Sequence, residues 1–161
     1  NLSTMDQTRK QAKLDFDGTP ATLIGTDGGG WDVLSTVLDL AAVGLAAEQV
    51  GGAQKVLEMA VDYAKVRVQF GRPIASFQTI AFKLADMATE IELARNLLYK
   101  ACWLCDEDRE FSKEAAMAKL YCSEMMHHCV DHAVQIHGGY GYTKDYPVER
   151  YLRDAQFCAA V

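Results

Sequence analysis

The chain has 161 residues, of which 50% are hydrophobic and 24% are charged, enough for the apolar core of one domain. Its net charge of −6 argues against nucleic acid or an anionic membrane as a partner, because both attract clustered Lys and Arg. We expect no membrane span, since Asp39, Glu48 and Lys55 interrupt the most apolar stretch. The five cysteines are an odd number and predict reduced thiols in a cytoplasmic protein rather than a disulfide framework.

Residues 1–30 differ in pattern from the rest of the chain. Apolar and polar side chains alternate from Ala12 to Phe16, which predicts a half-buried strand. Pro20 and the glycines up to Gly30 then predict a loop. We therefore treat residues 1–30 as a strand and a loop that precede the main domain.

From Trp31 onward, apolar residues recur at three- and four-residue steps, which predicts helices. The first is expected over about 31–68, and Gly51-Gly52 within it marks close packing or a slight bend. The second runs from an N-cap at Ser76 to about 107, and the third from a cap at Ser112 to Gly138. A fourth begins at Pro147. Residues 31–161 are therefore predicted to form an all-α domain, an antiparallel four-helix bundle.

Several short patterns suggest sites but lack the context that those sites need. Cys102 and Cys105 have half the spacing of a zinc or redox motif, with no second pair at ligand distance. His128 and His132 are four residues apart on one predicted helix, but the sequence shows no carboxylate that completes a metal site. The run from Gly138 to Gly141 follows a helix rather than a strand, so it does not predict a Rossmann loop. We predict no metal site.

Two separated segments offer what a flavin dinucleotide requires, namely a fixed cation, close backbone approach and aromatic or amide groups. Arg67 is suited to a diphosphate, although a surface salt bridge is an alternative for it. Gln69 and Gln78 are suited to adenine or ribose. Phe70 either contacts the cofactor or fills the end of the bundle. Gly138 and its neighbour Gly139 either admit a ligand or end a helix.

The order of motifs resembles the C-terminal domain of acyl-CoA dehydrogenases. That family shows Tyr-Ala-x-x-Arg-x-Gln-Phe-Gly-x-Pro-Ile, Phe-Gln, Leu-Ala-Asp-Met, Ala-Met-Ala-Lys, Gln-Ile-x-Gly-Gly-x-Gly-Tyr and Tyr-Pro-Val-Glu-Arg-x-x-Arg-Asp-Ala. The matching segments here are, in the same order, 63–74, 77–78, 84–87, 116–119, 135–142 and 146–155. By this resemblance, residues 1–30 are the tail of the family's middle β domain.

The resemblance implies that FAD is the cofactor and that an acyl-CoA thioester is the substrate. The reaction is α,β-dehydrogenation, in which a carboxylate removes the α-proton and the flavin accepts a hydride, within fatty acid and lipid metabolism. Active members are homo-oligomers, dimers or tetramers, or heteromers with a paralogue. The positions that match FAD contacts, largely to a neighbouring subunit's cofactor, are Arg67, Gln69, Phe70, Gln78, Gln135, Ile136, His137, Gly138 and Gly139.

The same resemblance locates the substrate side and shows a gap in it. Asp39 matches a substrate-contacting position, whereas Ala42 stands where many members have an arginine for CoA. The family's catalytic base is expected just after Val161, and its alternative position on the first helix is occupied by Ala41. Two hypotheses remain: a domain of a flavoenzyme, or a non-catalytic subunit that completes a partner's FAD site.

Overall fold

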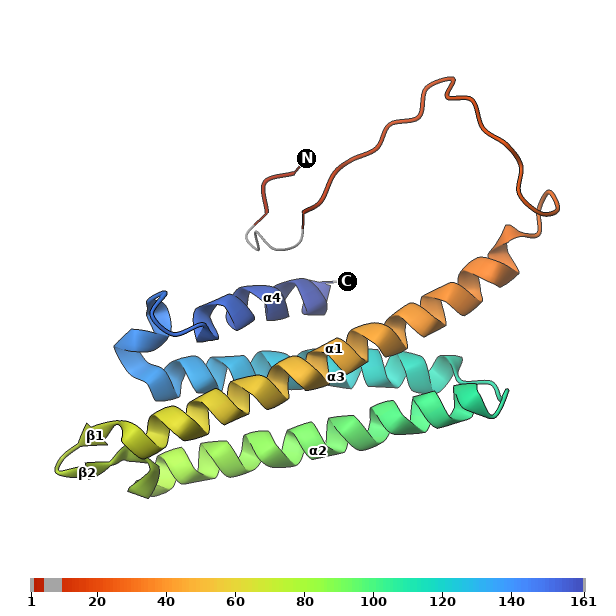
Figure 1. Ribbon diagram of the computed structural model, residues 1–161. Helices are drawn as coiled ribbons and strands as arrows, with labels where there is room; N and C mark the ends of the chain where they lie inside the picture. The colour runs from red at the N-terminus through yellow and green to blue at the C-terminus, as the bar shows by residue number, and fades with distance from the viewer. Residues whose placement is uncertain (1, 5–9, 161) are drawn as a thin grey trace.

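A computed structural model describes residues 2–4 and 10–160 and confirms the predicted helical bundle (Figure 1). Its helices are α1 (Gly30–Val66), α2 (Gln78–Asp106), α3 (Ser112–His137) and α4 (Val148–Ala160). Two short 3-10 turns, η1 (Ile74–Ser76) and η2 (Gly138–Tyr142), lie at the same end of the bundle. The predicted boundaries agree with these helices to within a few residues.

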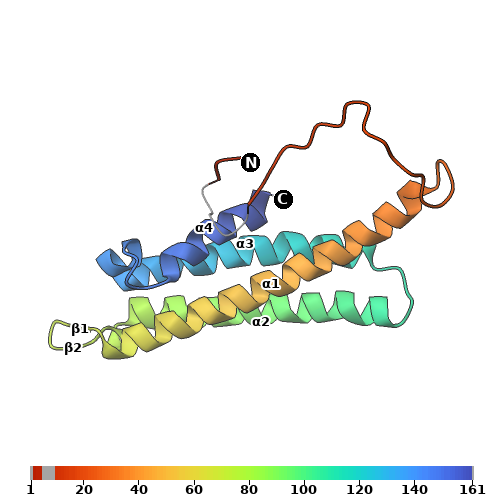
Figure 2. The ribbon, with the colours of Figure 1, turned by 45° about the horizontal axis from the view of Figure 1, so that its top comes forward.

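Helix α3 lies at the centre of the bundle and contacts α1, α2 and α4. Successive helices run in opposite directions, and the short α4 covers α3 and α1 on the side away from α2 (Figures 1 and 2). The buried side of α3 repeats at helical spacing, with Ala118, Cys122, Cys129 and Ala133 fully enclosed. These small side chains allow three neighbouring helices to approach α3 closely.

The glycine pair in α1 has two different environments. A Cβ added at Gly52 would lie 2.9 Å from the terminal methyl carbon of Met126 on α3, so this position marks close packing. A Cβ added at Gly51 would meet nothing within 4 Å. The predicted close contact is therefore found at Gly52 alone.

Both predicted serine caps are out of place by one residue. Helix α2 is capped at Phe77, and Ser76 lies in the η1 turn, where its hydroxyl donates to the Pro73 carbonyl at 2.7 Å. Helix α3 is capped at Phe111, and the hydroxyl of Ser112 donates to the carboxylate of Asp39 on α1. Each hydroxyl found a partner outside its own helix start, which a local spacing rule does not foresee.

A two-stranded hairpin follows α1, and the sequence pattern did not predict it. Strands β1 (Val68–Gln69) and β2 (Arg72–Pro73) pair antiparallel, with Phe70 and Gly71 at the turn. Both turn residues have positive φ, 52° and 78°, as a type I′ turn requires. Gly71 is typical of this turn. Phe70 is not, because Asn or Gly usually occupies the first central position, and so the sequence did not indicate a hairpin here.

The strand predicted near Ala12 to Phe16 is not formed. Residues 10–24 have no regular secondary structure and extend away from the helices (Figure 1). Leu14 and Phe16 expose 73% and 77% of their surface. A strand needs a neighbouring strand for its backbone hydrogen bonds, and the described residues place none beside this segment.

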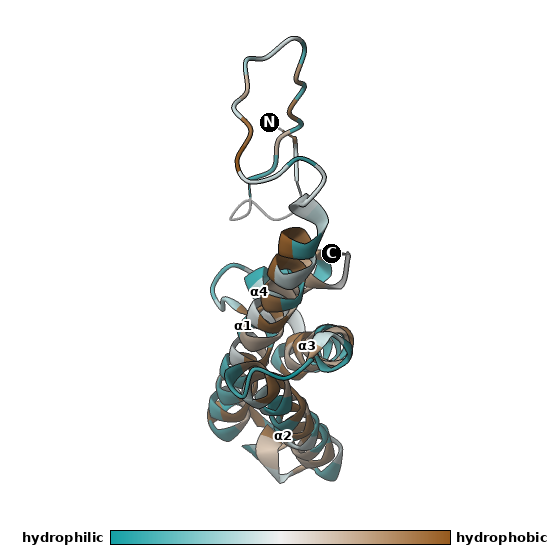
Figure 3. Cartoon of the chain, turned by 90° about the vertical axis from the view of Figure 1, so that its right-hand side faces the viewer, coloured by the Kyte–Doolittle hydropathy of each residue, from teal (hydrophilic) through white to brown (hydrophobic). Residues whose placement is uncertain are grey.

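The first half of α1 projects beyond the bundle, and part of it is coloured as hydrophobic (Figures 1 and 3). Trp31, Val33, Leu34, Val37 and Leu38 each expose between 46% and 68% of their surface. By length and composition alone, α1 is also apolar enough to cross a membrane, contrary to our expectation. A helix that lies in a protein interface satisfies the same criteria, so this property does not distinguish the two settings.

Candidate FAD-contact site

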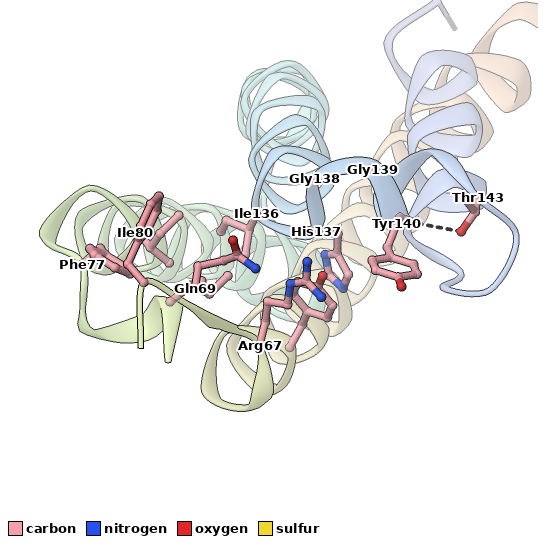
Figure 4. A pocket seen from close by; sticks show the side chains of 13 residues that line it. Arg67, Gln69, Phe77, Ile80, Ile136, His137, Gly138, Gly139, Tyr140 and Thr143 are labelled. Atoms are coloured by element: carbon pink, nitrogen blue, oxygen red, sulfur yellow. Dashed lines mark hydrogen bonds between the residues drawn. The ribbon is translucent and has the colours of Figure 1, made fainter. Parts of the chain in front are cut away.

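One pocket of about 610 Å³ opens at the end of the bundle that carries the hairpin (Figure 4). The end of α1, the hairpin, η1 and the start of α2 form one wall, and the end of α3 with η2 forms the other. Its lining residues are Tyr63, Arg67, Gln69, Phe70, Ile74, Phe77, Ile80, Ile136, His137, Gly138, Gly139, Tyr140 and Thr143. Two segments about seventy residues apart in the chain therefore meet at one cavity.

The structure brings most of the predicted cofactor residues together in this pocket. Its walls include Arg67, Gln69, Phe70 and every residue from Ile136 to Gly139. Gln78 and Gln135 do not line it: Gln78 is the exposed first residue of α2, and Gln135 is exposed on α3. These two residues match the sequence motif but lie outside the cavity.

Arg67 ends α1 in an extended conformation, and its backbone N–H still donates to the Tyr63 carbonyl at 2.9 Å. Its side chain is exposed, and the guanidinium lies 5.6 Å from the centre of the Tyr140 ring. Within the described residues the structure records no carboxylate partner for it. Arg67 therefore does not form a surface salt bridge, the alternative that the sequence left open, with any described residue, and its hydrogen-bond donors face the pocket side (Figure 4).

The turn of the hairpin presents an aromatic ring to solvent in an uncommon backbone conformation. Phe70 has a φ of 52° and exposes 92% of its surface. Its ring meets the edge of Phe77 at 6.2 Å between centroids, and the guanidinium of Arg72 lies 4.2 Å from the Phe77 ring centre. A bulky residue held at positive φ costs of order 1 kcal/mol or more, and such positions cluster at ligand contacts.

The three glycines at positions 138, 139 and 141 differ in why a side chain is absent there. Gly138 has a φ of 58°, which L side chains rarely adopt. A Cβ at Gly141 would lie 2.5 Å from the Val134 carbonyl oxygen, so no side chain fits there. A Cβ at Gly139 would meet nothing within 4 Å. Neither backbone conformation nor packing within the protein requires glycine at position 139. The absence of a side chain there leaves room for a ligand to approach the backbone closely.

An aromatic cluster supports this wall, and the sequence did not single it out. Tyr63 stacks on His137 at 4.3 Å between centroids, and Tyr146 meets both rings at 5.3 Å. Tyr140 in turn contacts Tyr146 at 5.8 Å. Its members lie up to 83 residues apart. Each belongs to one of the quoted motifs, and His137 was a predicted FAD contact, but no motif predicted that these rings pack together.

Asp39, the predicted substrate contact, lies far from this pocket. It is on the exposed half of α1, where it accepts a hydrogen bond from Ser112 at the start of α3. At about 1.5 Å per residue, Asp39 and Arg67 are about 40 Å apart along the helix. One chain therefore does not bring the two predicted contacts to one place.

The histidine pair for which the sequence predicted no metal has charged neighbours in the structure. His128 lies 2.8 Å from the Glu90 carboxylate on α2 and 4.1 Å, ring to ring, from His132. His132 in turn lies 3.3 Å from the ammonium nitrogen of Lys83. Glu90 is a carboxylate that the sequence did not connect with this pair. In the part of the chain that the structure describes, no three such side chains are arranged to hold a metal ion.

Comparison with known proteins agrees with the motifs. The profile of the acyl-CoA dehydrogenase C-terminal domain matches residues 28–160. A probable acyl-CoA dehydrogenase, YngJ of Bacillus subtilis, is 53% identical over 136 residues, which cover 84% of this chain and 36% of that protein. The CarC subunit of the caffeyl-CoA reductase-Etf complex of Acetobacterium woodii is 51% identical over 119 residues, 74% of this chain and 31% of CarC.

The butyryl-CoA dehydrogenase of Megasphaera elsdenii has a similar solved structure. It superimposes with a TM-score of 0.82 at 46% identity, covering 83% of this chain and 35% of that enzyme. The chain thus spans about a third of the length of the relatives that it matches. On its motifs, its fold and these comparisons, the chain belongs to the acyl-CoA dehydrogenase family and corresponds to its C-terminal domain.

Proposed function

We propose that the complete protein is an FAD-dependent acyl-CoA dehydrogenase and that the pocket at the hairpin end of this domain contacts the FAD. The observation that carries the proposal is the meeting of Arg67 and the 136–139 segment at one cavity. Bound FAD would supply the two-electron acceptor for the β-hydrogen. This chain would supply a cation for the diphosphate and an open backbone at Gly139 for close approach.

The residues present fit such a cofactor. The guanidinium of Arg67 has no recorded carboxylate among the described residues, so it is available to a phosphate. Ile74, Phe77 and Ile80 give one wall an apolar surface suited to the flat face of a ring system. Phe70 extends the same wall into solvent, where a ligand would cover it.

The distance between the two predicted contacts supports an oligomer. Asp39 and Arg67 are about 40 Å apart along α1, so one compact site does not include both residues. Substrate and flavin must touch for hydride transfer. We propose that a substrate near Asp39 reacts with a cofactor other than the one in this chain's pocket, as in a homo-oligomer, or a heteromer with a paralogue, whose subunits share sites.

The position of the general base decides between the two functions. A general base must reach the α-carbon of the thioester, and the family's position on α1 is occupied by Ala41. The expected base follows Val161. A carboxylate there supports the enzyme, whereas its absence supports the second function, a non-catalytic subunit that completes a partner's FAD site.

All five cysteines are free thiols, in keeping with the cytoplasmic setting that we propose.

The test is reduction of bound flavin in the complete purified protein by acyl-CoA thioesters of different chain length and branching. We expect at least one thioester to bleach the flavin absorbance and to support turnover with an artificial electron acceptor. The 161-residue chain alone, with added FAD, is the control and should show no turnover. A complete protein that binds FAD but is reduced by no thioester would favour the non-catalytic subunit.

A further inference from the structure

His137 is a buried histidine at the wall of the pocket, with 2% of its surface exposed. It is the last residue of α3, and Gly138 turns the chain sharply after it. The stacked ring of Tyr63 and the ring of Tyr146 hold the imidazole from two directions. Its orientation is therefore fixed before any ligand arrives.

Its hydrogen bonding decides which nitrogen carries the proton. Nδ1 lies 2.8 Å from the carbonyl oxygen of Ala133. A carbonyl only accepts, so Nδ1 must donate and bear the hydrogen. Within the described residues no partner is recorded for Nε2.

The surroundings favour the neutral ring. Burial lowers the pKa of His137 below its ordinary value, and the hydrogen bond to Ala133 opposes this only in part. The titratable and charged groups around it are Tyr63 and Arg67 from α1, Tyr140 from η2 and Tyr146 beyond it. Among the described residues, no Asp, Glu or Lys lines the pocket. A neutral imidazole with Nδ1 protonated has a lone pair on Nε2.

We propose that His137 is a specificity-determining acceptor of the pocket, whose Nε2 takes a hydrogen bond from a hydroxyl or amino group of the bound dinucleotide. This inference rests on the proposed function. Arg67 only donates and is suited to the diphosphate, which itself only accepts. His137 would instead read the donors that a dinucleotide carries on its sugars and adenine. Figure 4 shows the imidazole among the pocket side chains, beside Arg67 and Tyr140.

The test compares FAD affinity of the complete protein with its His137→Phe and His137→Gln variants. Phe keeps the flat ring against Tyr63 but has no acceptor, and we expect it to weaken FAD binding roughly three- to tenfold. Gln can present its amide oxygen near the position of Nε2, and we expect an affinity within about twofold of the wild type. Equal affinity of wild type and His137→Phe, or equal losses in both variants, would overturn the inference.

A pH series separates hydrogen bonding from packing. Protonation turns Nε2 into a donor, so the wild type should lose FAD affinity as the pH falls through the pKa of His137, which burial lowers below its ordinary value. His137→Gln should lack this component. The same pH profile in both proteins would contradict the role of Nε2.

Gly139→Val distinguishes failure of this inference from failure of the proposed function. The valine side chain would enter the cavity without meeting protein atoms at Cβ, so the fold should persist while FAD binding is lost. If Gly139→Val abolishes binding and His137→Phe changes nothing, only the inference fails. If Gly139→Val also leaves FAD affinity unchanged, the cofactor is not in this pocket and both proposals fail.

Discussion

Gln49 is a fully buried residue on α1 whose side-chain oxygen and nitrogen have no hydrogen-bond partner among the described residues. A buried polar group without a partner costs about 1–3 kcal/mol relative to one that is paired. Gln54, one and a half turns further along the same helix, bonds both Arg95 and Glu58. The two glutamines thus form a natural pair of test and control.

We predict that Gln49→Leu raises the free energy of unfolding by about 1–2 kcal/mol, because it removes an unsatisfied amide from the core at similar volume. Gln54→Leu should not stabilise, since it breaks existing hydrogen bonds. Urea unfolding followed by circular dichroism measures both. A destabilised Gln49→Leu would mean that the amide has a partner in solution, such as a buried water.

The candidate site shows how far single residues can be interpreted from sequence. Arg67 and Gly139 were predicted, and both line the pocket, because the motif fixes their positions in order along the chain. Gln78 was predicted as well, but it is the first residue of α2 and does not line the cavity. Tyr146 was quoted only as part of a motif, since its contacts with Tyr63 and His137 arise from packing between distant segments.

At the scale of elements, helical periodicity predicted α1 to α4 well, because apolar residues recur at helical spacing in each of them, including the half of α1 whose apolar side chains are exposed. The hairpin at 68–73 was missed, since two-residue strands have no period to detect and Phe70 is unusual in such a turn. The strand at 12–16 was wrong for another reason. Alternation of apolar and polar residues predicts that one face of a strand is buried. A strand also needs a second strand to pair with, and the described residues supply none.

The two glycines of α1 allow a test of packing against helix propensity. Gly51→Ala should stabilise the chain by about 0.5–1 kcal/mol, because alanine favours the helix and its methyl group meets nothing. Gly52→Ala gains the same propensity but places its methyl 2.9 Å from Met126. We therefore expect it to gain less than Gly51→Ala or to destabilise. Thermal unfolding compares the two, and equal gains would show that Met126 moves aside freely.

At the scale of the whole molecule, the bundle places the two regions predicted to contact ligands at opposite ends of α1. The hairpin end carries the pocket, and the other end carries Asp39 and the exposed apolar turns around Trp31 (Figure 1). An exposed apolar face of this kind is suited to cover by other protein surface. Periodicity alone predicted the bundle, whereas only the order of the motifs indicated the cofactor, because no single residue specifies a flavin.

The variant Arg67→Ala tests whether the pocket at the hairpin end contacts FAD. Arg109 is a matched control, since its guanidinium also lies over an aromatic ring, that of Trp103 at 5.2 Å, but at the opposite end of the bundle. The measurement is the FAD that the complete protein retains after extensive dialysis, with each variant checked for an unchanged unfolding temperature.

We expect Arg67→Ala to weaken FAD binding by roughly 1.5–3 kcal/mol, the cost of a lost charge-assisted hydrogen bond, while Arg109→Ala retains FAD like the wild type. Equal retention by the wild type and Arg67→Ala would contradict the account.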